Sequence, residues 1–277
     1  MTTPPQPPSP VPGFAAAAQP PAGTTIHTGE AGIVAGWATV ADGAALLPVY
    51  FAKPPGAGRF PVILVIQEVF GVHEHIADVA RRLAHLGYLA VAPDLFFRQG
   101  DARRAPDIDT LRRDFVAHTG DAQVIGDLER AASWAVGQGG DGGRMGITGF
   151  CWGGRIAWLY AAHLSAVNPA RLRAAVAWYG RLSGDATALM PRHPLDVARG
   201  ITIPVLGLYG GQDQGIPLDR VEAMRAVLRE AGGRSEIVVY PEAPHAFFAD
   251  YRSSYRAAAA ADGWGRMLAW FQQHGVR

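Results

Sequence analysis

The chain has 277 residues, of which 49% are hydrophobic and 18% are charged, a composition typical of a globular protein that buries one sizeable core. Its 25 basic and 24 acidic side chains nearly balance. The chain therefore lacks the excess positive charge that attracts a phosphate backbone, and we expect no nucleic-acid partner. The single cysteine, Cys151, excludes an intramolecular disulfide and a zinc site built from several cysteines.

The start of the chain is rich in proline and alanine. Residues 1–23 contain no Lys or Arg, and their longest apolar stretch is too short for a secretory signal. We therefore predict an extended arm over residues 1–29 and one globular domain over residues 30–277. No run approaches the roughly 18 apolar residues of a membrane span, so we expect a cytoplasmic protein with no membrane partner.

The predicted elements begin with a hairpin and continue as alternating strands and helices. Two β-prone runs, residues 33–40 and 46–51, flank the turn signal Ala41-Asp42-Gly43 and predict an antiparallel pair. From residue 61 onward, continuous apolar runs alternate with helical segments, which is typical of a mostly parallel sheet with helices on both faces. The predicted strands cover residues 62–67, 88–93, 143–148, 174–179, 203–209 and 235–240, and the predicted helices cover residues 73–86, 121–136, 152–164, 218–231 and 255–274. Residues 94–120 are predicted to be a polar, arginine-rich insertion.

A glycine-rich turn follows the strand predicted over residues 143–148. Its sequence is GFCWGG (149–154), and it opens a predicted helix, which is the strand–turn–helix context of a nucleophile elbow. Small residues are needed where the strand and helix backbones close around the nucleophile. A helix start also favours a thiolate and offers backbone N–H groups to an oxyanion. We therefore interpret Cys151 as a nucleophile, with an inert buried cysteine as the alternative.

Two further polar side chains follow predicted strands. Asp213 comes just after the strand at 203–209, and His245 comes after the strand at 235–240. The carboxyl ends of parallel strands meet at one edge of a sheet, where open α/β sheets place their ligands. The order Cys151, Asp213, His245 is the nucleophile–acid–histidine order of α/β-hydrolases. We predict that the three side chains meet; taken singly, a turn aspartate and a surface-loop histidine are the alternatives.

Several motifs together resemble the dienelactone hydrolase family, also called carboxymethylenebutenolidases. They are GFCWGG, VILVIQEVFGVHEHI (62–76), APDLFFRQG (92–100), YGGQD (209–213) and APHAFF (243–248). A cysteine in place of the usual elbow serine is the most specific mark of this resemblance. The resemblance implies an α/β-hydrolase fold and hydrolysis of an ester or lactone through a Cys-His-Asp triad and an acyl-thioester intermediate. No metal and no cofactor is expected.

The resemblance also implies roles for residues around the elbow. Family members share a Gln-Glu motif after an early strand, here Gln67-Glu68, whose glutamate interacts with the elbow cysteine and helps to form the thiolate. Independently, a carboxylate at the end of a buried strand needs a partner, unless it lies in solvent. By the same resemblance, the backbone N–H groups of Val69 and Trp152 would form the oxyanion hole.

The expected substrate-binding residues come from the same resemblance. Arg98 matches a family arginine that holds the substrate carboxylate, which a planar guanidinium fits bidentately; a solvated arginine is the alternative. Ala249 stands where a second such arginine is expected, and Arg252, three positions further on, could replace it. Tyr179 and Phe247 are expected to line the pocket, with ordinary core packing as the alternative.

His73 and His75 lie at a predicted helix start, where alternate residues do not share a face. We interpret them as polar residues rather than metal ligands.

Because Ala249 replaces an expected substrate-binding arginine, a broader esterase or thioesterase is a second possible function. A non-catalytic binding protein with this fold is the alternative from another class. The expected partner is a small-molecule ester or lactone, bound by a monomer or a small homo-oligomer.

Overall fold

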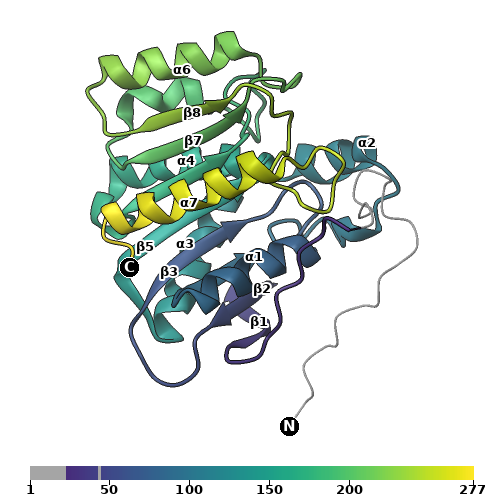
Figure 1. Ribbon diagram of the computed structural model, residues 1–277, viewed down its shortest axis with the longest axis vertical. Helices are drawn as coiled ribbons and strands as arrows, with labels where there is room; N and C mark the ends of the chain where they lie inside the picture. Colours follow the sequence, from purple (N-terminus) through teal and green to yellow (C-terminus); the bar gives the residue numbers. More distant parts are fainter. Residues whose placement is uncertain (1–22, 43–44) are drawn as a thin grey trace.

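The computed structural model describes residues 23–42 and 45–277, and Figure 1 shows their arrangement. Most of the expected arm, residues 1–22, and Gly43 of the expected turn lie outside the described residues. The described residues form an eight-stranded sheet in the order β1-β2-β4-β3-β5-β6-β7-β8. The strands are β1 (Val34–Asp42), β2 (Ala45–Lys53), β3 (Phe60–Ile66), β4 (Leu89–Pro93), β5 (Gly140–Phe150), β6 (Ala174–Trp178), β7 (Val205–Gly210) and β8 (Glu236–Tyr240).

The sheet is mixed, with its antiparallel part at the N-terminal end. Strand β2 pairs antiparallel with both β1 and β4, whereas the neighbours from β4 through β3 to β8 pair parallel. The predicted hairpin and the predicted mostly parallel sheet are therefore confirmed. Strands β4 and β6 are buried along their whole length, as expected where helices cover both faces, whereas the edge strand β8 is only partly buried.

Helices cover both faces of the sheet, as predicted. The helices are α1 (Glu74–His85), α2 (Ile108–Thr110), α3 (Asp121–Gly137), α4 (Trp152–Val167), α5 (Pro194–Val197), α6 (Leu218–Glu230) and α7 (Ala257–Gln273). In Figure 1, α1 and α7 lie in front of the sheet, and α3 and α4 lie behind it. Helix α1 packs on β2 and β4, and α4 packs on β5 and β6, so the elbow between β5 and α4 is set in the middle of the molecule.

The structure contains features that the sequence pattern does not predict, among them the short helix α5. Strand β5 begins at Gly140, three residues before the predicted strand, because a polar, glycine-rich stretch there pairs with Phe60 and Pro61. The polar insertion expected over residues 94–120 contains short helical turns, for which the sequence pattern made no prediction. Asp101 and Asp107 each accept a backbone N–H at the start of such a turn, which stabilises helical turns in a segment with little apolar periodicity.

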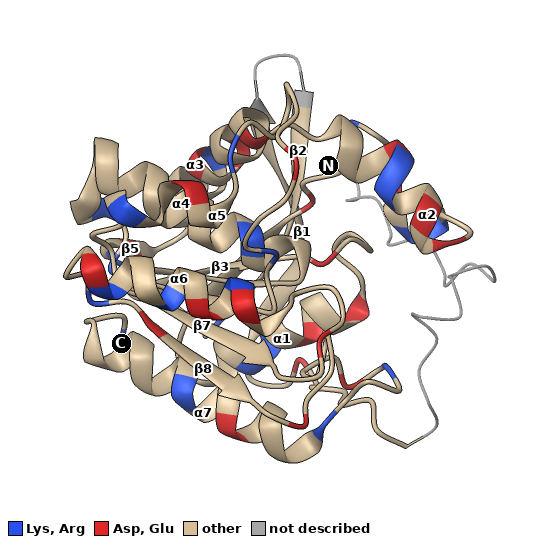
Figure 2. Cartoon of the chain, turned by 90° about the horizontal axis from the view of Figure 1, so that it is seen from above, with Lys and Arg blue, Asp and Glu red and all other residues tan. Residues whose placement is uncertain are grey.

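Basic and acidic residues alternate along several helices of the chain. Figure 2 shows blue and red residues interspersed, for example along α2 and α7. Among the described residues, no helix has the length and apolar character needed to cross a membrane.

Candidate active site

Cys151 lies at the tight turn between β5 and α4. Its backbone φ is 55°, a left-handed conformation that is strained for any residue other than glycine. The turn is held by backbone hydrogen bonds, because the N–H of Cys151 donates to the carbonyl of Trp178 at 3.0 Å and the Cys151 carbonyl accepts the N–H of Gly154 at 3.0 Å. Cys151 therefore stands directly before the first turn of α4, where the elbow motif predicts it.

The elbow glycines allow backbones to meet. A Cβ on Gly149 would lie 2.1 Å from the carbonyl oxygen of Gly153, and a Cβ on Gly153 would lie 2.5 Å from the carbonyl oxygens of Ile66 and Gln67. Both distances are far below van der Waals contact, so only glycine fits without a backbone shift. The elbow is consequently packed directly on the end of β3.

His245 lies between Cys151 and Asp213. Its Nε2 is 3.2 Å from the Cys151 sulfur, and its Nδ1 is 2.6 Å from Oδ2 of Asp213. Asp213 is buried, and its other oxygen, Oδ1, accepts the backbone N–H groups of Gly215 and Ile216 at 2.8 and 3.2 Å. The structure thus brings together the three residues that the sequence grouped, with the carboxylate held so that one oxygen faces the imidazole.

The environment of His245 favours its charged form. Burial opposes the charge, but the Cys151 sulfur and the Asp213 carboxylate raise the pKa of His245 to about 10. An imidazolium beside the sulfur favours the thiolate, which is the nucleophilic form of cysteine. Cys151 is partly exposed and the His245 side chain is 35% exposed, so a small molecule can reach both groups.

Two of the expected pocket residues lie beside His245. The Tyr179 ring meets the His245 ring edge-on, with 5.2 Å between the ring centres. The Phe247 ring also meets the Tyr179 ring edge-on, with 5.4 Å between their centres. Both aromatic side chains are fully buried. The Tyr179 hydroxyl has no hydrogen-bond partner among the described residues, which leaves a buried donor next to the sulfur–imidazole pair.

Glu68 is fully buried two residues past the end of β3, and its contacts differ from those that the resemblance implies. Oε2 of Glu68 accepts the Tyr251 hydroxyl at 2.5 Å and lies 3.4 Å from Nε2 of His73. Oε1 of Glu68 has no hydrogen-bond partner within the described part of the chain. The sulfur of Cys151 instead pairs with His245, so the implied contact between Glu68 and the thiol is absent from this arrangement.

The surroundings of Glu68 keep it ionised. Burial alone would raise the pKa of Glu68, but the hydrogen bond and charge of His73, together with His75 and Arg252, lower it to about 2. Burial and the adjacent Glu68 carboxylate raise the pKa of Tyr251, so its hydroxyl stays protonated and donates. The sequence identifies His73 only as a polar residue at a helix start, and it contains no pattern that marks Tyr251 as a partner of Glu68.

The two expected substrate arginines lie in different settings. Arg98 forms a bidentate pair with the buried Asp127 of α3, with Nη1–Oδ2 and Nη2–Oδ1 distances of 2.7 and 3.0 Å. Its guanidinium also lies over the Phe97 ring. The guanidinium of Arg252 lies over the Phe70 ring, 5.6 Å from its centre, and its charge acts on Glu68. Arg252 is therefore the one of the two that faces the Glu68 region, and substrate binding by either arginine stays a prediction.

The expected oxyanion donors come from two adjacent turns. Trp152 is the first residue of α4, and Val69 directly follows Glu68. Neither backbone N–H donates a hydrogen bond to another group within residues 23–42 and 45–277. Two backbone donors without another partner, one from each turn, are compatible with an oxyanion hole, which stays a prediction.

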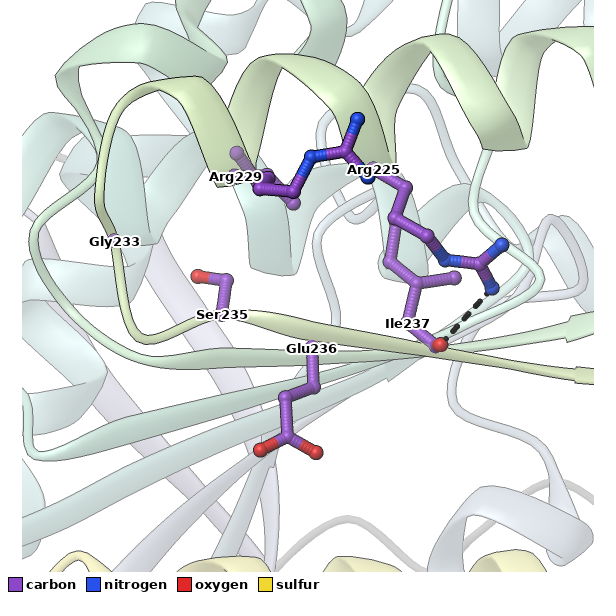
Figure 3. A pocket seen from close by; sticks show the side chains of 7 residues that line it. Arg225, Arg229, Gly233, Ser235, Glu236 and Ile237 are labelled. Carbon is purple, nitrogen blue, oxygen red and sulfur yellow. Dashed lines mark hydrogen bonds between the residues drawn. The ribbon is translucent and has the colours of Figure 1, made fainter.

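Other candidate sites are separate from this cluster. In the described residues, no group of three or more His, Cys, Asp or Glu side chains could hold a metal ion. Figure 3 shows a pocket of about 370 Å³ between α6 and β8, where Arg225 donates to the carbonyl of Ile237 at 3.1 Å. That pocket includes Glu236, the first residue of β8, whereas His245 follows the opposite end of the strand. It contains none of the expected site residues.

Comparisons with known proteins agree on one family. A model described as the Dienelactone hydrolase family matches residues 47–275. A Salmonella typhimurium protein named "Putative carboxymethylenebutenolidase" is 55% identical over 264 residues, which cover 95% of this chain and 96% of that relative. A crystal structure named "Putative Dienelactone Hydrolase", from Klebsiella pneumoniae, is 55% identical, with a TM-score of 0.83 and coverage of 87% of this chain and 99% of that one. A dienelactone hydrolase-like promiscuous phosphotriesterase from metagenomic libraries is 26% identical, with a TM-score of 0.72 and coverage of 88% and 99%.

Proposed function

Because the chain belongs to the dienelactone hydrolase family and has an α/β-hydrolase fold, we propose that it hydrolyses an ester or lactone with Cys151 as the nucleophile. The observation that carries this proposal is the position of His245, which contacts the Cys151 sulfur at 3.2 Å and Asp213 at 2.6 Å. One imidazole can then exchange a proton with the substrate while the carboxylate keeps its orientation.

In the proposed acylation step, the Cys151 thiolate attacks the carbonyl carbon of the substrate. The carbonyl oxygen becomes an oxyanion, which the backbone N–H groups of Val69 and Trp152 stabilise. When the tetrahedral intermediate collapses, the bond to the leaving oxygen breaks and the His245 imidazolium protonates that oxygen. The products are an alcohol, or the ring-opened hydroxyl of a lactone, and a thioester on Cys151.

In the proposed deacylation step, neutral His245 takes a proton from water. The resulting hydroxide attacks the thioester carbonyl, and the same two N–H groups stabilise the second oxyanion. The carbon–sulfur bond then breaks, Cys151 returns to the thiolate and His245 is again the imidazolium. Asp213 orients the imidazole throughout. We assign this chemistry to one domain over residues 30–277, since the described residues share one hydrophobic core.

The proposal is tested with a panel of activated esters and lactones on the wild type, Cys151→Ala and His245→Ala. We expect kcat/KM to fall by about a thousandfold or more in both variants, because each lacks one member of the nucleophile–base pair. His163→Ala, which removes a partly exposed histidine of α4, is the matched control and should keep full activity. Retention of more than a few per cent of activity in Cys151→Ala would contradict the assignment.

Intact mass spectrometry separates the enzyme from a non-catalytic binding protein. A slowly hydrolysed ester should leave an acyl adduct on the wild type and none on Cys151→Ala. A wild type that binds the ester but never gains the acyl mass would support the binding protein instead.

A broader esterase or thioesterase is the second candidate, and the pairing of Arg98 with Asp127 favours it. The same panel decides, through kcat/KM for neutral esters against matched esters that carry a carboxylate. A carboxylate preference that Arg252→Ala abolishes would support the narrower function, whereas equal values would support the broader one. A phosphotriester belongs in the panel, because a 26% identical relative is named a promiscuous phosphotriesterase.

A further inference from the structure

The described start of the chain bridges two parts of the structure. Residues 24–30, here called the strap, form no regular helix or strand, and in Figure 1 they run past α1 in dark purple. The hydroxyl of Thr24 donates to the backbone carbonyl of Asp250 at 2.7 Å. Further along the strap, the carbonyl of Thr28 accepts Nε of Arg81 at 2.8 Å. The strap therefore joins helix α1 to the loop that carries His245.

The strap closes a ring of polar contacts with α1 and this loop. The Thr28 N–H donates to Oδ1 of Asp78 at 2.5 Å, and Nε of Arg82 donates to Oδ2 of Asp78 at 2.5 Å. Nη2 of Arg82 also donates to Oδ2 of Asp250 at 2.6 Å, and the Asp250 carbonyl accepts the Thr24 hydroxyl. Asp78 and Asp250 are both buried, so the ring satisfies polar groups that are shielded from water. Asp250 is thus held by its carboxylate and by its backbone.

The backbone next to His245 needs such support. Ala246 has a φ of 59°, a left-handed conformation that is strained for alanine. Its carbonyl accepts the Ala249 N–H at 3.0 Å and the Ser254 hydroxyl at 3.2 Å, from residues on either side of Asp250. Backbone strain persists only where the surrounding contacts hold it. The contacts that fix Asp250 therefore also hold the turn that begins at His245.

We propose that Thr24 is a positioning residue, whose hydrogen bond to Asp250 fastens the strap to the His245 loop and so keeps the imidazole between Cys151 and Asp213. The positioning role rests on the proposed function, in which His245 is the general acid and base. Thr24 acts through the loop and not on the reacting atoms.

Loss of the Thr24 hydroxyl should affect the chemical steps more than substrate binding. The imidazole must stay within reach of both of its partners, 3.2 Å from the Cys151 sulfur and 2.6 Å from the Asp213 carboxylate. A looser loop spends less time in that arrangement, which lowers kcat more than it raises KM. One neutral hydrogen bond contributes modestly, so we expect a loss of about threefold.

The first measurement compares ester hydrolysis by the wild type, Thr24→Val and Thr24→Ser. Valine has the shape of threonine without the hydroxyl, and we expect kcat to fall about threefold with KM nearly unchanged. Serine keeps the hydroxyl and should restore most of kcat. Thr25→Val is the matched control, because the neighbouring Thr25 hydroxyl has no hydrogen-bond partner among the described residues. This control should keep the kcat of the wild type.

The second measurement needs no substrate. Hydrogen exchange at the backbone amides of Ala249, Arg252 and Arg256, which all bond within the His245 loop, reports how firmly this loop is held. In Thr24→Val we expect these amides to exchange about threefold faster, while the amides of β6 exchange as in the wild type. Thr25→Val should exchange as the wild type does throughout.

Each outcome has a defined meaning. Unchanged exchange in Thr24→Val would show that the strap does not hold the loop, which would overturn the proposal whatever the kinetics. Faster exchange with a wild-type kcat would also overturn it, because the contact would then serve stability alone. A wild type that hydrolyses no ester, or a fully active Cys151→Ala, would overturn the proposed function, and the exchange rates would still decide whether the strap holds the loop.

Discussion

Glu68 illustrates how a single buried side chain makes stability depend on pH. The pKa of Glu68 is about 2 in the folded protein and has an ordinary value of 4.5, so the folded state holds the ionised form more favourably than the unfolded chain does. The resulting stabilisation is complete above about pH 4.5 and is lost as the pH falls from 4.5 towards 2. Its size is on the order of 3 kcal/mol.

We predict that the unfolding free energy of the wild type falls more steeply below about pH 4.5 than that of Glu68→Gln, which has no proton to take up there. Urea unfolding from about pH 7 to pH 3 measures both slopes. Glu242→Gln, which removes an exposed carboxylate, should match the wild type. If the unfolding free energies of the wild type and Glu68→Gln changed in parallel with pH, Glu68 would have the same pKa in the folded and the unfolded protein.

Local sequence motifs were enough to predict Cys151, Asp213 and His245, but not Tyr251. Cys151 could be found because glycines flank it at a strand-to-helix turn, and Asp213 and His245 because each follows an apolar strand. Tyr251 could not be found, since its partner Glu68 lies 183 positions away and nothing near Tyr251 in the sequence marks the contact. The implied bond between Glu68 and the thiol is absent, because Oε2 of Glu68 contacts the nearby His73 and the remote Tyr251 instead.

At the scale of elements, the junction of β3, β5 and α4 carries the elbow. We predict that Gly153→Ala lowers the unfolding free energy by about 2 kcal/mol or more, because its Cβ would strike the carbonyls of Ile66 and Gln67 at 2.5 Å. It should also slow acylation of Cys151, since the backbone shift moves the sulfur. Urea unfolding and single-turnover ester kinetics measure the two effects.

Gly265→Ala supplies the contrasting control within the same protein. Gly265 lies inside α7 with open space where the methyl group of an alanine would lie, so alanine should stabilise the helix by about 0.5–1 kcal/mol. If Gly153→Ala and Gly265→Ala changed the unfolding free energy equally, the backbone around Gly153 would accommodate the added methyl group without a loss of stability.

Strands could be predicted from the sequence where they consist of an unbroken run of apolar residues. Strands β3, β4 and β6 are buried apolar runs, and their positions matched the sequence pattern to within a few residues. The first residues of β5 and the turns over residues 102–118 are polar or rich in glycine. Their structure depends on pairing with Phe60 and on aspartate caps, which leave no periodic signal.

At the scale of the whole molecule, Asp250 joins the His245 loop to α1. Its carboxylate contacts Nδ1 of His75 at 3.2 Å and accepts Nη2 of Arg82 at 2.6 Å, with all but about 1% of the carboxylate side chain buried. We predict that Asp250→Asn lowers the unfolding free energy by about 2 kcal/mol, because it removes one of the two carboxylates that bind the Arg82 guanidinium, the other being Asp78. Urea unfolding measures this loss, and kcat/KM should fall with it as the loop loosens.

Asp262→Asn is the comparison for that experiment. Asp262 pairs with Arg266 on the exposed side of α7, where ion pairs contribute about 0–1 kcal/mol. A loss in Asp250→Asn no larger than in Asp262→Asn would contradict the structural role of the buried network.

The sheet order has a further consequence for how the site would fail. The sulfur follows β5, in the middle of the sheet, whereas His245 follows β8, an edge strand that is only partly buried. Edge strands open by local unfolding at a lower free energy than central ones. The proposed hydrolysis would therefore stop when β8 frays and withdraws the imidazole, while the strand that carries the thiol is still folded.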